Sequence, residues 1–186
     1  MIASAAAAST GMIAHAPSIG PAIKAGGATY FLSGVMGGSQ TASSKSLGIP
    51  MESQDYRGQI RAAILAADEA ANIVDPLEMG AVRGRELGFG EGKPSWTDDA
   101  DVRKLFAEVV DAAAAADVVV SYLPTASMGS ACELHAAHAA HKTVLCIAPG
   151  SMAQNWVVRS FSARTFEDIP ALAWFLKETR GGADVA

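Results

Sequence analysis

The stretch DVVVSYLPTASMGSACELHAAHAAHKTVLCIA, residues 117–148, predicts the fold of this chain. It begins with a short β-branched run, Asp117–Leu123, and it ends with another, Thr143–Ala148. The Ala-rich segment between them, from about Ser130 to His141, has the composition of a helix. A strand, a helix and a second strand in this order form a βαβ unit, so the two strands are expected to run parallel in one sheet.

The same alternation continues on both sides of this unit. Three further strands are expected, at Ala28–Gly34, Asn72–Asp75 and Arg164–Phe166. Further helices are expected around Ile60–Ala67 and Val102–Ala113, where apolar residues recur at helical spacing, at about Gln154–Phe161, and after Asp168. The pattern indicates a single α/β domain of three layers, α-β-α, around a five-stranded, parallel, doubly wound sheet of the flavodoxin-like or Rossmann-like kind.

The commoner five-stranded sheet of this class has the strand order 2-1-3-4-5, and its ligand site lies where the ends of strands 1 and 3 diverge. With that order, the segments Ser33–Gly38 and Pro124–Gly129 face each other across the site. Two connections, Val35–Asp55 and Pro76–Thr97, are longer than loops usually are, and loops of such length often cover a site.

Composition narrows the class of protein. The 186 residues include 14 Lys and Arg against 19 Asp and Glu, and a net charge of −5 argues against binding a polymeric nucleic acid. No apolar run is long enough for a membrane span, so no membrane partner is expected. Cys132 and Cys146 are interpreted as reduced thiols of a cytoplasmic protein. The domain is expected to span residues 28–180, between a flexible N-terminal extension at 1–27 and a tail at 181–186.

Residues that could bind or act on a ligand are concentrated between the strand Asp117–Leu123 and the next helix. Ser127, Gly129 and Ser130 surround the expected start of that helix, where free backbone N–H groups favour an anion such as phosphate or carboxylate. Glu133 lies one turn further on and could act on a ligand. An alternative interpretation is a capping box, in which Glu133 and Ser130 only satisfy the start of the helix.

Other polar residues have two interpretations as well. His135, His138 and His141 follow one another at steps of three, but each step turns ~60° around a helix, so no metal site is expected. Asp75, before Pro76, either ends a strand or contacts a base or sugar. Asp117 is either a cap or a residue that orients a neighbour.

Four features together resemble the nucleoside 2-deoxyribosyltransferase superfamily, which includes 2′-deoxynucleoside 5′-monophosphate N-hydrolases and CMP-type N-glycosidases. The features are the segment Tyr30–Gly38, the run ADVVV at Ala116–Val120, the spacing Ser127-x-Gly129-x-x-x-Glu133, and Asn155 some 22 positions after the glutamate. The resemblance covers about residues 28–170.

The resemblance implies a role for each of these residues. Glu133 would attack or stabilise the anomeric carbon, with Tyr30 on strand one beside it. Contacts to the sugar or the 5′-phosphate would come from the glycine-rich loop with its preceding serine and from the helix start, namely Ser33, Gly34, Gly37, Gly38, Ser127 and Gly129. Asn155 would reach the site of a neighbouring subunit in a homodimer or larger homo-oligomer. No cofactor or metal would be needed.

Two positions depart from the family pattern. Val109 stands where the family usually has an aspartate; Glu108 and Asp111 flank this position, and Asp111 is taken as the candidate proton donor. Met36 stands where the nucleotide hydrolases tend to have an arginine.

The resemblance predicts an enzyme that cleaves the N-glycosidic bond of a small-molecule nucleoside or nucleoside 5′-monophosphate, with transfer of the (deoxy)ribosyl group to water or to another base. Two alternatives are open. One is a non-catalytic nucleotide-binding or sensing module on the same scaffold, and the other is a phosphoribohydrolase of the lysine-decarboxylase-like type.

Overall fold

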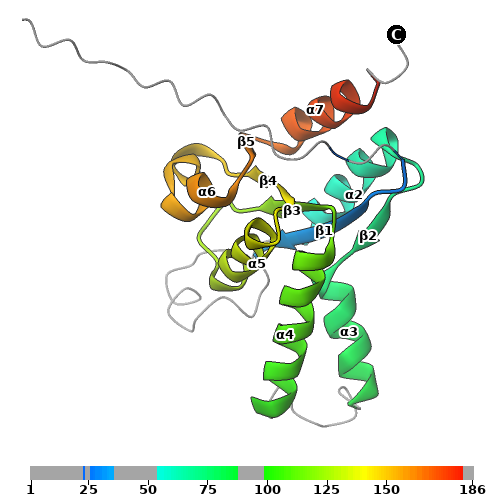
Figure 1. Ribbon diagram of the computed structural model, residues 1–186, viewed down its shortest axis with the longest axis vertical. Helices are drawn as coiled ribbons and strands as arrows, with labels where there is room; N and C mark the ends of the chain where they lie inside the picture. The colour runs from blue at the N-terminus through cyan, green and yellow to red at the C-terminus, as the bar shows by residue number, and fades with distance from the viewer. Residues whose placement is uncertain (1–22, 24–25, 36–53, 88–98, 182–186) are drawn as a thin grey trace, which may run out of the picture.

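The computed structural model describes residue 23 and residues 26–35, 54–87 and 99–181 of the chain. Its centre is one sheet of five parallel strands in the order β2-β1-β3-β4-β5, which confirms the predicted fold class and strand order (Figure 1). The strands are β1 (Thr29–Gly34), β2 (Asn72–Val74), β3 (Val118–Tyr122), β4 (Thr143–Ile147) and β5 (Arg164–Phe166).

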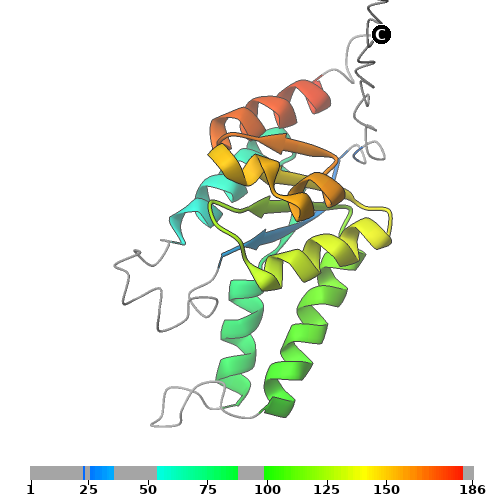
Figure 2. The same ribbon diagram turned by 90° about the vertical axis from the view of Figure 1, so that its left-hand side faces the viewer.

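Helices cover both faces of the sheet and complete the three layers, as the turned view shows most clearly (Figure 2). One face carries α2 (Asp55–Ala67) and α7 (Ile169–Gly181), and the other carries α4 (Asp99–Ala115), α5 (Met128–Ala139) and α6 (Trp156–Phe161). The remaining helical elements are α3 (Pro76–Glu86), beside α4, and the 3-10 turn η2 (Gly150–Gln154) before α6.

The central strands are buried on both faces, which explains their nearly continuous apolar sequences. Along β1, Tyr30 and Leu32 belong to the core under α2 and α7, whereas Phe31 belongs to the core under α4 and α5. The same alternation separates Val118 and Val120 of β3 from Val119. Ser33, next on the Phe31 side of β1, is therefore directed toward α5.

The prediction of a long loop over Pro76–Thr97 is wrong in its first half, because Pro76–Glu86 forms α3. Asp75 begins this helix, since its side chain accepts a hydrogen bond from Leu77 N at 2.9 Å, and Pro76 occupies a first-turn position that needs no N–H donor. Gly80 and Gly84 weaken the helical signal in the sequence. Residues 88–98, and most of the other predicted loop, lie outside the described residues.

Asp117 links two strands, because its carboxylate accepts a hydrogen bond from Thr29 N at 2.9 Å. Of its two interpretations, the structural one therefore holds.

In the part of the chain that the structure describes, no helix combines the length and apolar character that crossing a bilayer requires.

Candidate functional site

Three side chains form a hydrogen-bonded chain at the carboxyl ends of β1 and β3. Ser33 and Ser121 are register partners on these strands, and both are fully buried. The Ser121 hydroxyl donates to Ser33 Oγ at 3.2 Å, and the Ser33 hydroxyl donates to Glu133 Oε2 at 2.5 Å. The sheet edge thus holds a carboxylate that comes from α5.

The helix start that precedes Glu133 is satisfied without it. Ser127 is the N-cap of α5, and its hydroxyl oxygen accepts hydrogen bonds from Ser130 N at 3.3 Å and from the Ser130 hydroxyl at 3.2 Å. The capping-box interpretation of Ser130 and Glu133 is therefore wrong. Glu133 is 4% exposed and is bonded to another element, an arrangement that helix capping does not explain.

A buried ion pair approaches this edge from the other face of the sheet. Arg57, in the first turn of α2, donates from Nη1 to Asp75 Oδ1 at 2.7 Å and to the carbonyl oxygen of Leu32 at 3.2 Å. Its Nε donates to Gln54 Oε1 at 2.8 Å. The same Asp75 oxygen receives Leu77 N, so one carboxylate both pairs with Arg57 and begins α3.

Arg57, like Ser121, is a residue of this site that sequence reasoning missed. A signal was present, because Arg57 precedes Ile60 by three residues and Ile64 by seven, which places it on the apolar stripe of α2. A charged residue on such a stripe must have a buried partner, and the sequence does not identify which one.

Burial dominates the acid–base properties of the site. It raises the pKa of Glu133 above the ordinary carboxyl value, while the hydrogen bond from Ser33 and the positive charge of Arg57 oppose that rise. Burial also raises the pKa of Tyr56 to about 12, with Arg57 opposing and Asp75 adding to the rise. The Tyr56 hydroxyl therefore stays protonated and donates to the carbonyl oxygen of Val35 at 3.2 Å.

Two predicted catalytic residues are not part of this cluster. Tyr30 is buried in the core under α2 and α7, on the face of the sheet opposite to Ser33 and α5. Asp111 is exposed on α4, whose buried residues Val109 and Ala113 face the sheet. A strand that is buried on both faces gives no sequence signal for the direction of any one side chain, which explains the placement of Tyr30.

The remaining predicted contacts have varied positions. Gly34 ends β1 beside the Tyr56 ring, Gly129 is the second residue of α5, and Asn155 caps α6 by accepting from Val157 N at 2.9 Å. Gly37 and Gly38 lie outside the described residues. Each of these assignments stays a prediction.

The three histidines of α5 are spread along and beyond that helix. His135 and His138 lie against Phe161, with ring centroids 5.4 and 5.3 Å from it, and His141 follows the helix end with φ 57°. Within the described ranges, no group of three or more His, Cys, Asp and Glu side chains is placed to hold a metal ion.

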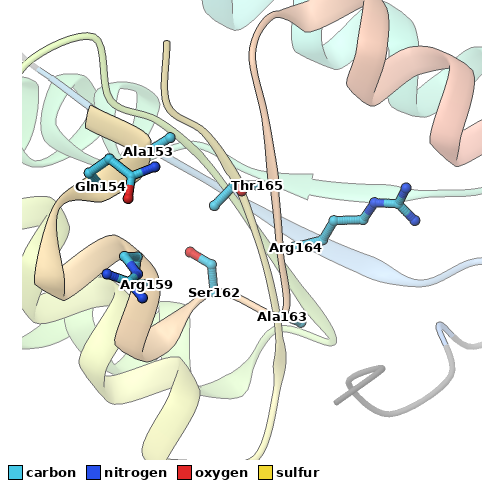
Figure 3. Close-up of a pocket in the computed structure, with 7 residues that line it drawn as sticks. All are labelled: Ala153, Gln154, Arg159, Ser162, Ala163, Arg164 and Thr165. Atoms are coloured by element: carbon cyan, nitrogen blue, oxygen red, sulfur yellow. The ribbon is translucent and has the colours of Figure 1, made fainter. Parts of the chain in front are cut away.

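A separate surface hollow of about 500 Å³ lies between η2, α6 and β5 (Figure 3). Its polar lining includes Gln154, Arg159, Ser162 and Thr165. Arg164 points away from the others and places its guanidinium carbon 4.6 Å from the ring centroid of Phe175. None of the residues around Glu133 lines this hollow.

No protein-family model and no curated protein sequence matches the chain. Among solved structures, a conserved protein from Enterococcus faecalis is similar, with 17% identity and a TM-score of 0.51 over 82% of this chain and 98% of that one. A 2-deoxyribosyltransferase from Bacillus psychrosaccharolyticus is similar with 14% identity and a TM-score of 0.51, over 78% of this chain and 90% of that one.

A CMP N-glycosidase from Clostridium botulinum has 14% identity and a TM-score of 0.43, over 81% of this chain and 98% of that one. The conclusion about the fold is drawn from the proteins of Enterococcus faecalis and Bacillus psychrosaccharolyticus. The fold that the sequence resemblance implies is confirmed, because this chain has the fold of a 2-deoxyribosyltransferase.

Proposed function

We propose that this protein cleaves the N-glycosidic bond of a nucleoside or nucleoside 5′-monophosphate and transfers the (deoxy)ribosyl group to water or to another base. The observation that carries the proposal is the buried carboxylate of Glu133, which the Ser33 hydroxyl holds at the carboxyl ends of β1 and β3. The fold shared with a 2-deoxyribosyltransferase supports the same reaction class.

The reaction requires a negative group close to the sugar. Breaking the bond between C1′ and the base nitrogen passes through a transition state with positive charge on the ring, which an ionised carboxylate stabilises and can capture as a glycosyl ester. Ser33 occupies Glu133 Oε2, and no hydrogen bond from the described residues reaches Oε1. We assign Oε1 to the anomeric carbon.

Substrate contacts are proposed from the elements around this carboxylate. The start of α5, with Ser127 and Gly129, offers backbone N–H groups to the 5′ end of the substrate. Gly37 and Gly38, outside the described residues, are proposed as further contacts to the same end. Asp75 contacts the base or sugar, and Asn155 of a second copy completes the site in a homodimer. Tyr30 and Asp111 have no part in this proposal because of their positions.

The test is release of free base, followed by chromatography, from a panel of ribonucleosides, deoxyribonucleosides and their 5′-monophosphates. Glu133→Gln keeps the size of the side chain and an acceptor for Ser33 but removes the charge. We expect it to lower the rate of base release by at least ~10²-fold, the effect typical of removing a preorganised electrostatic group. Glu69→Gln, at an exposed position after α2, controls for the loss of one negative charge.

Absence of base release from every substrate would overturn the proposal. If a nucleotide then still raised the melting temperature, the protein would be a binding or sensing module. Burial of Val109, at the position where the family resemblance places an aspartate, is the observation that favours this second candidate.

A further inference from the structure

The guanidinium group of Arg57 has one buried N–H edge for which the described residues provide no acceptor. Arg57 is 4% exposed, and its Nη1 and Nε are bonded to Asp75, Leu32 and Gln54. Its Nη2 is buried and has no hydrogen-bond partner within residues 26–35, 54–87 and 99–181. Buried charged donors are almost always paired, so an N–H of this kind points to an acceptor from outside the described residues, such as a bound ligand.

The position of this free edge is fixed. The ion pair with Asp75 at 2.7 Å and the bond to the Leu32 carbonyl hold the fork at the ends of β1 and β2. The guanidinium carbon also lies 5.2 Å from the centroid of the Tyr56 ring. Because these contacts come from three directions, they hold the guanidinium plane, and with it Nη2, in one orientation. The positive charge of Arg57 also acts on Glu133, where it opposes the rise in pKa that burial causes.

The proposed reaction leaves one chemical need unmet among the described residues. The departing base accumulates negative charge, and something must stabilise it. Asp111 is exposed on α4, the Asp75 carboxylate is engaged by Arg57, and the Tyr56 hydroxyl donates to the Val35 carbonyl. Arg57 is always charged and cannot give up its proton, but it can donate a strong hydrogen bond to the base.

Resting on the proposed function, we infer that Arg57 activates the leaving base through a hydrogen bond from Nη2 to a ring acceptor conjugated with the glycosidic nitrogen. In a pyrimidine this acceptor is the 2-carbonyl oxygen, and in a purine it is N3. The C1′–N bond breaks and its electron pair passes to the base, where the charge spreads onto the atom that Arg57 contacts. Glu133 Oε1 forms the new bond to C1′.

The base anion then takes a proton from a water molecule. The resulting hydroxide attacks C1′, the ester bond breaks, and Glu133 returns to the carboxylate. Free base and free sugar are the products of one substrate and one water. In transfer, the base anion takes its proton from the N–H of an incoming base, and the nitrogen so freed attacks C1′ in place of the hydroxide while the ester bond breaks.

The first test is Arg57→Lys, which keeps a positive charge for Asp75 but removes the second donor edge. The variant is assayed with nucleosides whose bases differ in acidity, such as uracil and 5-fluorouracil derivatives. We expect at least a tenfold fall in kcat/KM for the uracil substrate and a clearly smaller fall for the fluorinated one, because the more acidic base needs less stabilisation. Arg61→Lys, in the exposed pair with Glu78, is the matched control on the same helix.

An equal loss for both substrates, or no loss, would overturn the role of Arg57 while leaving the proposed function intact. Failure of the wild-type protein to release any base would instead overturn the proposed function. If Arg57→Lys does not fold, a measurement on wild type decides the question. A 3-deazapurine nucleoside lacks the N3 acceptor, and for a purine substrate we expect at least a tenfold lower kcat/KM with it. Equal kcat/KM for the two purines would contradict the inference.

Discussion

Gly34 is a glycine because the Tyr56 side chain occupies the space where a Cβ would lie. A Cβ at this position would meet Tyr56 Oη at 2.5 Å and two of its ring carbons at 3.0 Å. The ring cannot easily withdraw, since it is buried and stacked on Tyr122 with centroids 4.6 Å apart. Gly34, the last residue of β1, thus has a packing role, and the ligand contact that the resemblance implies for it stays a prediction.

Gly34→Ala is therefore expected to destabilise the fold. Displacing Tyr56 breaks its hydrogen bond to Val35, and overpacking of this kind costs ~1–3 kcal/mol. Urea unfolding measures the loss. Gly58→Ala, at an exposed position of α2 with nothing within 4 Å of the added Cβ, is the control and should gain up to ~1 kcal/mol. A neutral Gly34→Ala would contradict the close approach seen here.

Some site residues could be predicted from sequence because their chemistry is encoded locally. The spacing of Ser127, Gly129 and Glu133 is a local motif, and the position of Ser33 follows from the end of a strand. Arg57 and Ser121 could not be identified in this way. One lies on an apolar stripe and the other inside an apolar strand, and only the folded chain supplies their partners.

Among the secondary-structure elements, the pair of Arg57 and Asp75 fastens α2 to the start of α3. Both side chains are about 95% buried, at 5% and 6% exposure. Removing one partner leaves an uncompensated buried charge, which typically lowers the free energy of unfolding by ~3–5 kcal/mol. Asp75→Asn is the suitable change, because asparagine still caps α3 but no longer neutralises Arg57.

We expect Asp75→Asn and Arg57→Gln each to lower the free energy of unfolding by ~3–5 kcal/mol. The double variant should lose much less than the sum of these two losses, because it leaves no uncompensated buried charge. Denaturant titration of the four proteins measures this coupling. The pair of Arg61 and Glu78 also joins α2 to α3 but is 34% and 64% exposed, so its cycle should give only ~0–1 kcal/mol. Additive losses at Arg57 and Asp75 would contradict the buried pair.

Prediction of the elements succeeded wherever the apolar period was strong. The expected strands agree with β1 to β5 to within one residue at every end, and α4 follows its repeat of apolar residues. Failure occurred at α3, where two glycines interrupt the period, and at the start of α5, where Met128 is already helical. In both places a polar cap, Asp75 or Ser127, determines the helix start.

On the scale of the whole molecule, the site exists because the sheet is covered on both faces. Glu133 reaches the carboxyl edge from α5 on one face, and Arg57 reaches it from α2 on the other. The strand order that brings β1 and β3 together followed from the alternation of strands and helices and from the commoner topology of this class. The position of Glu133 at this edge did not follow from the sequence, because it depends on a hydrogen bond from Ser33, which lies 100 residues away in the chain.

Burial of Glu133 makes the stability of the whole domain depend on pH. Its carboxyl has a higher pKa in the folded chain than the ordinary value of 4.5, so the folded chain binds more protons than the unfolded chain above about that pH. Stability contributed by this group is therefore full below pH 4.5 and is lost as the pH rises toward the raised value.

Glu133→Gln removes this titration while keeping an acceptor for the Ser33 hydroxyl. The variant should gain stability relative to wild type as the pH rises above 4.5, by up to about 1.4 kcal/mol per pH unit, until Glu133 is fully ionised. Urea unfolding between pH 4.5 and neutral pH measures the difference, with Glu69→Gln as the exposed control. If the free energies of unfolding of Glu133→Gln and wild type differed by the same amount at every pH, burial would not raise the pKa of Glu133 in the folded chain. The proposed enzyme would then lack the desolvated carboxylate on which its chemistry depends.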